Sequence, residues 1–391
     1  MKRREFLRGA AAGVLGGLGL TLAACGQPPA VTNPPTTAPA QPTTAGGEQP
    51  TAQAPAQGSS MPAVEWRMGT SWPISLDTIY GGATVLAERV AELSGGMFKI
   101  NTFPAGELFP GLEVLQNVSQ GTVESGHTAL YYYVGLDPAW AFATSLPFGL
   151  TAQQQNSWLY HGGGEEAINK LGANFGVICF AAGNTGTQMG GWFRREINTV
   201  ADLQGLKMRI PGLGAQVMKA LGVVTQTLPG GEIFQALSTG AIDAAEWVGA
   251  YDDEKLGLPD ATDFYYTPGW WEPGPSLHAV FNLDAWNKLP KEYQNFLRVA
   301  AWESNMNMLA KYDALNNDAL ERIIAKGKKV RPYSDEILNA AQKAAFELFA
   351  SYDSAAFKEI FPGWNSFRQK IQRWHQTNEL PFNLFVKNNP I

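Results

Sequence analysis

The stretch from Asn184 to Trp247 decides the fold, because it places three polar motifs at the ends of short apolar runs. The motifs are NTGTQMGGW at 184–192, KMRIPG at 207–212 and AAEW at 244–247. In open α/β sheets, ligands bind beyond the carboxyl ends of the strands. Asn184, Arg209 and Glu246 all fall at such ends, so the sequence predicts that they meet at one binding site.

The residue types in these motifs indicate a small anion. Arginine presents a planar fork of donors that matches a carboxylate, which favours Arg209 as its binding group. Glu246 beside the same anion would repel it unless a cation lay between them. Oxygen ligands without cysteine or histidine suit a hard cation rather than zinc. The alternative is that Glu246 is a plain salt-bridge partner of Arg209, and the residues alone leave both interpretations open.

Short strand-like runs alternate with helical patterns around these motifs, which predicts a mostly parallel sheet covered by helices. Before Asn184 we expect strands at 64–68, 98–103, 123–129 and 177–182, and helices from about 77 to 94, at 112–118 and at 151–171. From Trp192 onward we expect strands at 192–194, 206–211, 224–228 and 243–247, and helices at 200–203, 215–221 and 231–239. No linker separates the two groups. The second is therefore predicted to be a lobe inserted into the first.

After Trp247 the chain is predicted to become mainly helical. A strand through 278–282 comes first, and a long helix is expected at 291–326. A further helix carries an apolar stripe that is predicted to be core: Ile337, Ala341, Ala345, Leu348 and Tyr352. The chain ends with PFNLFV at 381–386, an apolar segment that we expect to dock on something.

The N-terminus predicts export and attachment to a membrane. KRREFLR at 2–8 is a twin-arginine run, and the short apolar segment after it ends in LAAC at 22–25. This pattern indicates a signal peptide at 1–24. LAAC resembles the lipobox of bacterial lipoproteins, in which the cysteine is lipidated; the alternative is a generic cleavage site with an incidental Cys25. Residues 25–62 have too few apolar side chains to fold and are predicted to form a disordered tether.

Charge and cysteine content exclude some functions. The net charge is −6, and removal of the leader, with four basic residues and Glu5, would make it about −9. A chain this acidic has no electrostatic reason to bind nucleic acid. With Cys25 in the lipobox, Cys179 has no partner for a disulfide. It lies in an apolar run and is predicted to be a small buried side chain.

A search for enzyme motifs favours a binding protein. The four histidines lack the spacing of a metal site, and neither a zincin helix nor a Gly-x-Ser-x-Gly elbow occurs in the sequence. GLGAQV at 212–217 follows a strand as a dinucleotide loop would, but Val217 replaces the third glycine. We interpret this segment as a turn that aims helix N–H groups at an anion. The protein is predicted not to be an enzyme.

The motifs resemble those of a known family. LQGLKMRIPG at 203–212 resembles the strand motif of the DctP-type solute-binding proteins of TRAP transporters. NTGTQMGGW and AAEW resemble, more narrowly, the subgroup that binds 2-oxo and 2-hydroxy monocarboxylates such as pyruvate and lactate. The similarity runs from about Trp66 to the C-terminal helices. It implies an α/β, two-lobed fold like that of periplasmic binding proteins, with a ligand cleft between the lobes and a helical C-terminal part.

The resemblance implies roles for single residues in holding the ligand. Arg209 matches the position that grips the substrate carboxylate, and Tyr133 and Asn184 match positions that hydrogen-bond the ligand. Val248 stands where family members often carry an aromatic residue, which leaves the size of the acid open. Glu272, within the segment WWEPG at 270–274, is given only a lining role.

The resemblance also implies a cation that the substrate shares with the protein. Gln188, Glu246 and the main-chain carbonyl of Trp247 match positions that hold Na⁺ or Ca²⁺. The same three residues therefore belong to the predicted substrate site. In this arrangement the cation removes the conflict between Glu246 and an anionic ligand.

The implied organisation is that of a tethered receptor. Lobe I would begin at 63–185, lobe II would be inserted at 186–250, and 251–391 would return to lobe I with a cross-lobe strand and C-terminal helices. The implied partners are a small carboxylate, the TRAP membrane permease subunits, the membrane through a lipid anchor, and a second copy through the C-terminal helices. The location would be the periplasm, on the outer face of the cytoplasmic membrane. A sensory receptor for the same ligand, or an enzyme acting on small carboxylic acids, stays open as an alternative.

Overall fold

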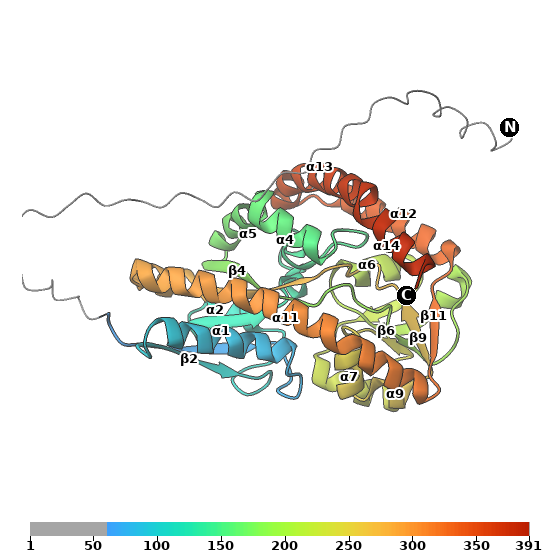
Figure 1. The fold of residues 1–391 in the computed structure, drawn as a ribbon, viewed down its shortest axis with the longest axis horizontal. Helices are drawn as coiled ribbons and strands as arrows, with labels where there is room; N and C mark the ends of the chain where they lie inside the picture. The colour runs from blue at the N-terminus through green and yellow to red at the C-terminus, as the bar shows by residue number, and fades with distance from the viewer. Residues whose placement is uncertain (1–60, 391) are drawn as a thin grey trace, which may run out of the picture. The chain divides into compact units, whose positions relative to one another are not determined.

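The computed structural model describes residues 61–390 and contains two β-sheets with helices around them (Figure 1). The predicted signal peptide, the lipobox cysteine and nearly all of the predicted tether lie outside these residues. Between residues 61 and 390, no helix combines the length and the apolar character that a membrane span requires.

The first sheet has five strands in the order β2-β1-β3-β10-β4. Strands β1, β2 and β3 are parallel, and β10 runs antiparallel between β3 and β4. Their bounds are Val64–Thr70 for β1, Phe98–Phe103 for β2, Ser125–Thr128 for β3, Val177–Asn184 for β4 and Ser276–Asn282 for β10. The five strands predicted for these segments are confirmed. We call the part of the molecule around this sheet lobe I.

The second sheet, around which we define lobe II, has the order β11-β9-β5-β8-β6-β7. Its strands are Trp192–Phe193 (β5), Lys207–Arg209 (β6), Val224–Gln226 (β7), Ala244–Ala245 (β8), Phe264–Thr267 (β9) and Lys329–Pro332 (β11). Strands β9 and β11 lie after residue 250, in the segment that the sequence assigned to lobe I. The stacked rings of Trp192 and Tyr265, 3.9 Å apart, show why β9 pairs with β5 in lobe II.

Helices flank both sheets. Those of the first half are α1 Ile79–Leu93, α2 Val114–Ser119, η1 Leu130–Tyr133, α3 Trp140–Thr144, α4 Ala152–His161 and α5 Gly164–Ala173. Lobe II carries η2 Val200–Leu203, α6 Gly212–Ala220, α7 Gly230–Ser238, α8 Ala250–Lys255 and α9 Leu258–Ala261. The last third holds α10 Leu283–Lys288, α11 Lys291–Ala325, α12 Asp335–Ser351, α13 Ala355–Thr377 and α14 Glu379–Asn388.

The single helix expected at 151–171 was a wrong prediction, because the chain breaks into α4 and α5 at three consecutive glycines. Gly163 has a φ of +81°, which an L side chain rarely adopts. Gly162 and Gly164 lie so close to Trp158 that neither leaves space for a Cβ atom. The break therefore follows from both backbone conformation and packing.

Helix α11, 35 residues long, links the two lobes. Figure 1 shows it running from beside α1 and β4 towards α9. In lobe I, Ser304 donates a hydrogen bond to the Ala182 carbonyl of β4 at 2.7 Å. In lobe II, Arg322 forms an ion pair with Glu254 of α8 at 2.7 Å. One continuous helix thus contacts both sides of the molecule.

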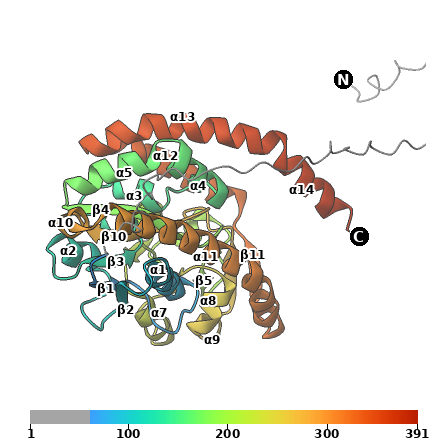
Figure 2. The same cartoon turned by 60° about the vertical axis from the view of Figure 1, so that its left-hand side comes forward.

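The C-terminal helices differ in burial. Apolar side chains of α12 are buried in the core, among them Ile337 and Phe349. Helix α13 packs on α4, and its buried Trp364 lies against Phe142 of α3. Every residue of α14 is exposed, and Figure 2 shows α14 extending from the end of α13 away from both sheets. Of the stripe predicted on α12, Ile337, Ala341 and Ala345 are core, whereas Leu348 and Tyr352 are half-buried against it. The apolar chain end has no cover within residues 61–390.

Candidate ligand-binding site

Arg209 is the last residue of β6, and its side chain is only 1% exposed. Its Nε donates to the Leu228 carbonyl at 3.0 Å. Its Nη1 donates to the Glu246 carbonyl at 2.9 Å and also to the Glu246 carboxylate. The guanidinium carbon lies 5.1 Å from the centre of the Trp247 ring. Nη2 has no hydrogen-bond partner among the described residues, so one edge of the guanidinium can still take an acceptor.

Glu246 reaches Arg209 because of strand register. The parallel pairing of β6 and β8 sets Arg209 opposite Ala245, and Glu246 follows at the same end of the sheet. Its side chain is fully buried, with Oε1 on the guanidinium and Oε2 without a partner in residues 61–390. Burial raises the pKa of Glu246, and the adjacent Arg209 opposes this rise. The structure thus joins the predicted arginine and glutamate in one buried ion pair.

Glu272 is a second buried carboxylate next to this pair. It is 4% exposed, and its Oε2 has no partner in the described part of the chain. Burial and the negative charge of Glu246 raise its pKa well above the ordinary value. The sequence assigned Glu272 only a lining role; the signal for more was an acidic residue within the otherwise apolar segment 270–274. Among residues 61–390, Arg209 forms an ion pair with Glu246 and with no other carboxylate, so Glu272 has no cationic partner.

Gln188 lies in the turn between β4 and β5. Its Nε2 donates to Thr185 Oγ1 at 3.1 Å, while Oε1 is buried and lacks a partner among residues 61–390. Its main-chain N–H donates to the Glu272 carbonyl at 3.2 Å. The turn that carries Gln188 is therefore fixed against the segment that carries Glu272.

A small cavity with room for about one water molecule lies between the lobes, beside Gln188 and Trp247. Val248, the residue that left the size of the bound acid open, is part of the cavity wall. The full lining is Trp72, Ile79, Ala129, Tyr131, Tyr132, Thr185, Gln188, Trp247, Val248, Pro275 and Leu277. The ring of Trp72 is held by a hydrogen bond of 2.7 Å from its Nε1 to Nδ1 of His127.

Arg209 and Glu246, the buried ion pair, lie outside this lining, and so do two further predicted ligand contacts, Tyr133 and Asn184. The hydroxyl of Tyr133 is 3.1 Å from Thr128 Oγ1 and accepts from the Leu115 N–H at 3.1 Å, whereas its neighbours Tyr131 and Tyr132 line the cavity. The Asn184 amide donates to the Gly274 carbonyl at 3.2 Å and accepts from the Gly186 N–H at 2.8 Å. The Tyr133 hydroxyl thus connects α2 to β3, and the Asn184 amide connects the segments around Gly186 and Gly274.

The partnerless atoms indicate what the site can bind. Leaving a buried polar atom unpaired costs about 1–3 kcal/mol. Here the donor is Nη2 of Arg209, and the acceptors are single oxygens of Gln188, Glu246 and Glu272. A carboxylate would satisfy the donor, and a hard cation would satisfy the oxygens. No three His, Cys, Asp or Glu side chains of residues 61–390 gather as a metal site, so such a cation would also need carboxamide or carbonyl oxygens.

The sequence matches a family description that agrees with these features. Residues 68–355 match DctP, the bacterial extracellular solute-binding proteins of family 7. The chain belongs to this family. It is thus a solute-binding receptor, in agreement with the resemblance seen in the motifs and with the two-lobed fold.

Relatives of this family-7 protein share most of its length. The monocarboxylate 2-oxoacid-binding periplasmic protein of Nostoc sp. PCC 7120 is 60% identical over 334 residues, which is 85% of this chain and 91% of the relative. A TRAP transporter solute-binding protein of Bordetella bronchiseptica, solved as a dimer with calcium and picolinate, is 45% identical with a TM-score of 0.83, covering 84% of this chain and 98% of that one. A TRAP protein of Pseudoalteromonas atlantica with sodium and pyruvate is 32% identical with a TM-score of 0.79, covering 82% and 98%.

Proposed function

We propose that this receptor binds a small monocarboxylate bearing an oxygen at C2, together with Na⁺ or Ca²⁺, and delivers it to the membrane subunits of a TRAP transporter. The observation that carries the proposal is the buried Arg209–Glu246 pair, in which each partner keeps one polar atom that no residue from 61 to 390 contacts by a hydrogen bond. Arginine–carboxylate salt bridges are frequently bidentate, and a bidentate pair would leave neither atom in this state.

The electrostatics beside Arg209 support a cation. Burial raises the pKa of both Glu246 and Glu272, so negative charge is already disfavoured there, and a carboxylate ligand would add more of it. We propose that Arg209 takes the ligand carboxylate and that Gln188 Oε1, Glu246 and the Trp247 carbonyl hold the cation. The cation then offsets the repulsion that the ligand would otherwise meet in a site shielded from water.

The ligands of the relatives share a chemical pattern that fits this site. Pyruvate and picolinate each carry a carboxylate and a second donor atom on the neighbouring carbon, so each can chelate a cation in a five-membered ring. The cavity walls formed by Trp72, Val248 and Leu277 are apolar, and the cavity is small. We therefore propose that short 2-oxo or 2-hydroxy acids bind, with their apolar end against these walls.

The three tyrosines after β3 are proposed to have different roles in ligand binding. We propose that Tyr131 and Tyr132 face the ligand, since they line the cavity. Tyr133 and Asn184, predicted as direct contacts, would then support the site by fixing Thr128 and the 274–276 segment. Tyr132→Phe should weaken binding more than Tyr133→Phe.

Calorimetry tests the cation and the ligand class together. Pyruvate and lactate are titrated into protein in calcium, in sodium, and after chelation in a buffer free of both ions. We expect affinity to fall at least about tenfold when both ions are removed, because the ligand then meets Glu246 directly. Equal affinity in all three conditions would contradict the cation. Recovery of chemically unchanged ligand after incubation, checked by mass spectrometry, would separate this receptor from an enzyme.

We further propose that two copies pair through α14. A groove of about 1140 Å³ lies between α4, α11, α12 and α13, and exposed apolar side chains of α11, Trp302 and Met306, lie at or near it. Helix α14 carries Phe382 and Phe385 in exposed positions. Light scattering should show a dimer that Phe382→Glu with Phe385→Glu converts to a monomer. A wild-type monomer at micromolar concentration would reject the pairing.

Export and anchoring are proposed from the sequence alone. The twin-arginine run and LAAC at 22–25 indicate a lipid on Cys25, with the receptor on the outer face of the cytoplasmic membrane. Cys25→Ala should release the protein from the membrane fraction while leaving ligand affinity unchanged. A wild-type protein found only in the soluble periplasmic fraction would argue for a generic cleavage site.

A further inference from the structure

Two consecutive buried carboxylates, Asp252 and Asp253, follow the Glu246–Trp247 motif on helix α8. Asp252 is 0% exposed and Asp253 is 1% exposed. Neither forms an ion pair with any residue between 61 and 390, although burying an unpaired charge is costly. Such groups need hydrogen bonds in compensation, and the partners of the two carboxylates lie in different parts of the molecule.

Asp253 bonds only within lobe II. It accepts from Trp192 Nε1 at 2.9 Å, from the Tyr265 hydroxyl at 2.7 Å and from the Val248 N–H at 3.2 Å. Trp192 and Tyr265 belong to neighbouring strands of the second sheet. Asp253 therefore fixes the segment between β8 and α8, which includes Trp247 and its carbonyl, against the sheet of its own lobe.

Asp252 instead bonds outside lobe II. The hydroxyl of Thr78, the residue before α1 of lobe I, donates to Oδ1, and the hydroxyl of Tyr312 on α11 donates to Oδ2 at 2.6 Å. Thr78 is next to Ile79, which lines the ligand cavity. The Asp252 carboxylate thus joins lobe I, lobe II and the linking helix beside the cavity.

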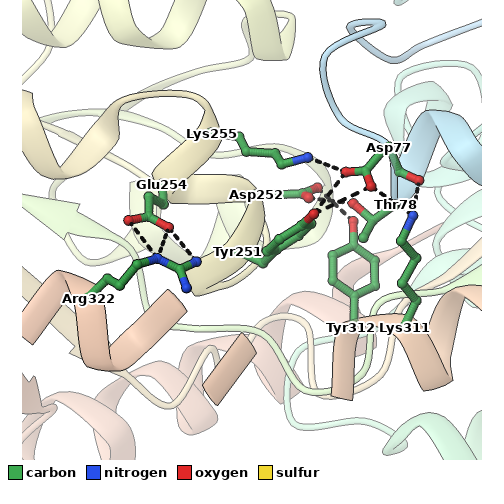
Figure 3. Close-up of polar contacts among 9 residues, drawn as sticks. All are labelled: Asp77, Thr78, Tyr251, Asp252, Glu254, Lys255, Lys311, Tyr312 and Arg322. Atoms are coloured by element: carbon green, nitrogen blue, oxygen red, sulfur yellow. Dashed lines mark hydrogen bonds and ion pairs between the residues drawn. The ribbon is translucent and has the colours of Figure 1, made fainter. Parts of the chain in front are cut away.

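A second set of contacts surrounds this carboxylate at the surface (Figure 3). Asp77, adjacent to Thr78, accepts from Lys311 Nζ of α11 at 2.8 Å and forms an ion pair with Lys255 of α8. The Tyr251 hydroxyl also donates to Asp77 at 3.2 Å. Asp77 therefore joins the same three parts of the molecule as Asp252 does.

We propose that Thr78 and Asp252, with Asp77 around them, form an interlobe joint that holds the two lobes together and slows release of the ligand. The two aspartates are positioning residues. Asp252 connects lobe I to α8, and Asp253 connects α8 to the segment that presents the Trp247 carbonyl. Separation of the lobes must break the Thr78–Asp252 hydrogen bond and the Asp77–Lys255 ion pair. The ligand-release role rests on the proposed function, whereas the mechanical coupling of the lobes does not.

The variant that tests the joint is Thr78→Val, which removes the hydroxyl and keeps the shape. Asp252→Asn probes the same bond from the other side but buries a new amide and can impair folding. Glu254→Gln is the matched control, because Glu254 is also on α8 and pairs with Arg322 of α11 without contact to lobe I. Figure 3 shows this pair apart from the cluster around Asp77 and Asp252.

The measurement is the dissociation rate of pyruvate in calcium, followed by stopped-flow tryptophan fluorescence. A hydrogen bond to a charged group supports an increase of about tenfold or more for Thr78→Val, with the association rate changed less than about threefold. Thr78→Ser should restore the wild-type rate, and Glu254→Gln should stay within about twofold of it. An unchanged dissociation rate in Thr78→Val, or an equal increase in Glu254→Gln, would overturn the proposal.

Hydrogen exchange separates failure of the joint from failure of the proposed function. If the wild-type protein binds no small carboxylate, the proposed function fails, and the joint is then judged on the ligand-free protein. Thr78→Val should raise deuterium uptake in the first turn of α1 and in α8 together, because each loses its contact with the other lobe. Glu254→Gln should raise uptake in α8 alone. Uptake unchanged in both segments of Thr78→Val would exclude the joint.

Discussion

Two pairs of buried carboxylates lie close together in the sequence and the fold, yet their surroundings differ. Glu246 and Glu272 each have an oxygen without a partner among residues 61–390, whereas Asp252 and Asp253 direct both oxygens at donors. Burial is the same for all four. The difference shows that hydrogen-bond satisfaction, rather than burial, distinguishes a binding site from a structural joint in this molecule.

The direction of the pKa shifts does not distinguish the glutamate pair from the aspartate pair. Burial raises the pKa of Asp252 to about 6 and that of Asp253 to about 7, and it also raises the pKa of Glu246 and Glu272. All four groups therefore resemble candidate functional carboxylates by this measure. Only the positions of the donors assign the aspartates to the joint and the glutamates to the ligand.

The largest effect is expected at Arg209, which pairs with Glu246 and lies near Glu272. Arg209→Ala leaves Glu246 buried without its partner and removes the clamp on the ligand carboxylate. Loss of one member of a desolvated pair costs about 2–5 kcal/mol, so affinity for pyruvate should fall by more than about thirtyfold in calorimetry. Arg331→Ala, at an exposed pair with Glu196, is the control and should leave affinity unchanged. Near-wild-type affinity in Arg209→Ala would remove the carboxylate clamp from the site.

A direct comparison of the pairs comes from Glu272→Gln and Asp253→Asn. Asp253→Asn replaces one acceptor oxygen by an amide donor, which must face either the Trp192 and Tyr265 donors or the Val248 N–H. It should lower the free energy of unfolding by about 1–3 kcal/mol. Glu272→Gln removes a buried carboxyl group whose Oε2 has no partner among residues 61–390, so the free energy of unfolding of the ligand-free protein should stay the same or rise. Ligand affinity should fall, because this carboxyl oxygen is no longer available to the cation that the ligand shares.

Urea unfolding and calorimetry on both variants supply the check. Wild-type protein in the same buffer, with and without pyruvate and calcium, is the reference. A larger loss of stability in Glu272→Gln than in Asp253→Asn would contradict the distinction between the two pairs, because Glu272 would then be a structural group like Asp253. It is sharpened if the two variants lose, respectively, affinity without stability and stability without affinity.

Much of this arrangement could be predicted from the sequence because it depends on local pattern. Strands such as 98–103 and helix 291–326 are long, periodic segments, and their bounds came within a few residues of those observed. The meeting of Arg209 and Glu246 followed from their positions at strand ends. The break after His161 was also readable, since three consecutive glycines end a helix.

The rest depended on contacts between distant segments. Nothing local to Glu272 shows that it lies beside Glu246, and nothing local to Asp252 shows that its partners are Thr78 and Tyr312. In the run of three tyrosines after β3, the sequence could not tell which rings face the cavity, because a one-residue rotation of η1 exchanges them. The neighbours of Glu272, the partners of Asp252 and the orientation of the tyrosines all depend on contacts between segments that are distant in the sequence.

The smallest expected effect extends the comparison to two buried histidines on adjacent strands. Both ring nitrogens of His127 lie within hydrogen-bonding distance of partners, Trp72 Nε1 at 2.7 Å and the Ala182 carbonyl at 3.1 Å, whereas Nδ1 of His278 has none in the described residues. Burial nevertheless lowers both pKa values, to about 4 for His127 and about 3 for His278. Here too burial, and not hydrogen bonding, sets the direction of the shift.

The sign of the pH dependence follows from these lowered values. Below pH of about 6.5 these histidines become protonated in the unfolded chain but stay neutral in the folded protein. The free energy of unfolding therefore falls as the pH drops towards the folded pKa values. Each histidine contributes at most about 1.4 kcal/mol per pH unit. In urea unfolding, His278→Gln should therefore reduce the change in the free energy of unfolding per pH unit between pH 6 and pH 4 by the contribution of one histidine. Measurement of the variant at pH 8 isolates its packing effect, and an unchanged slope would show that His278 takes up its proton while folded.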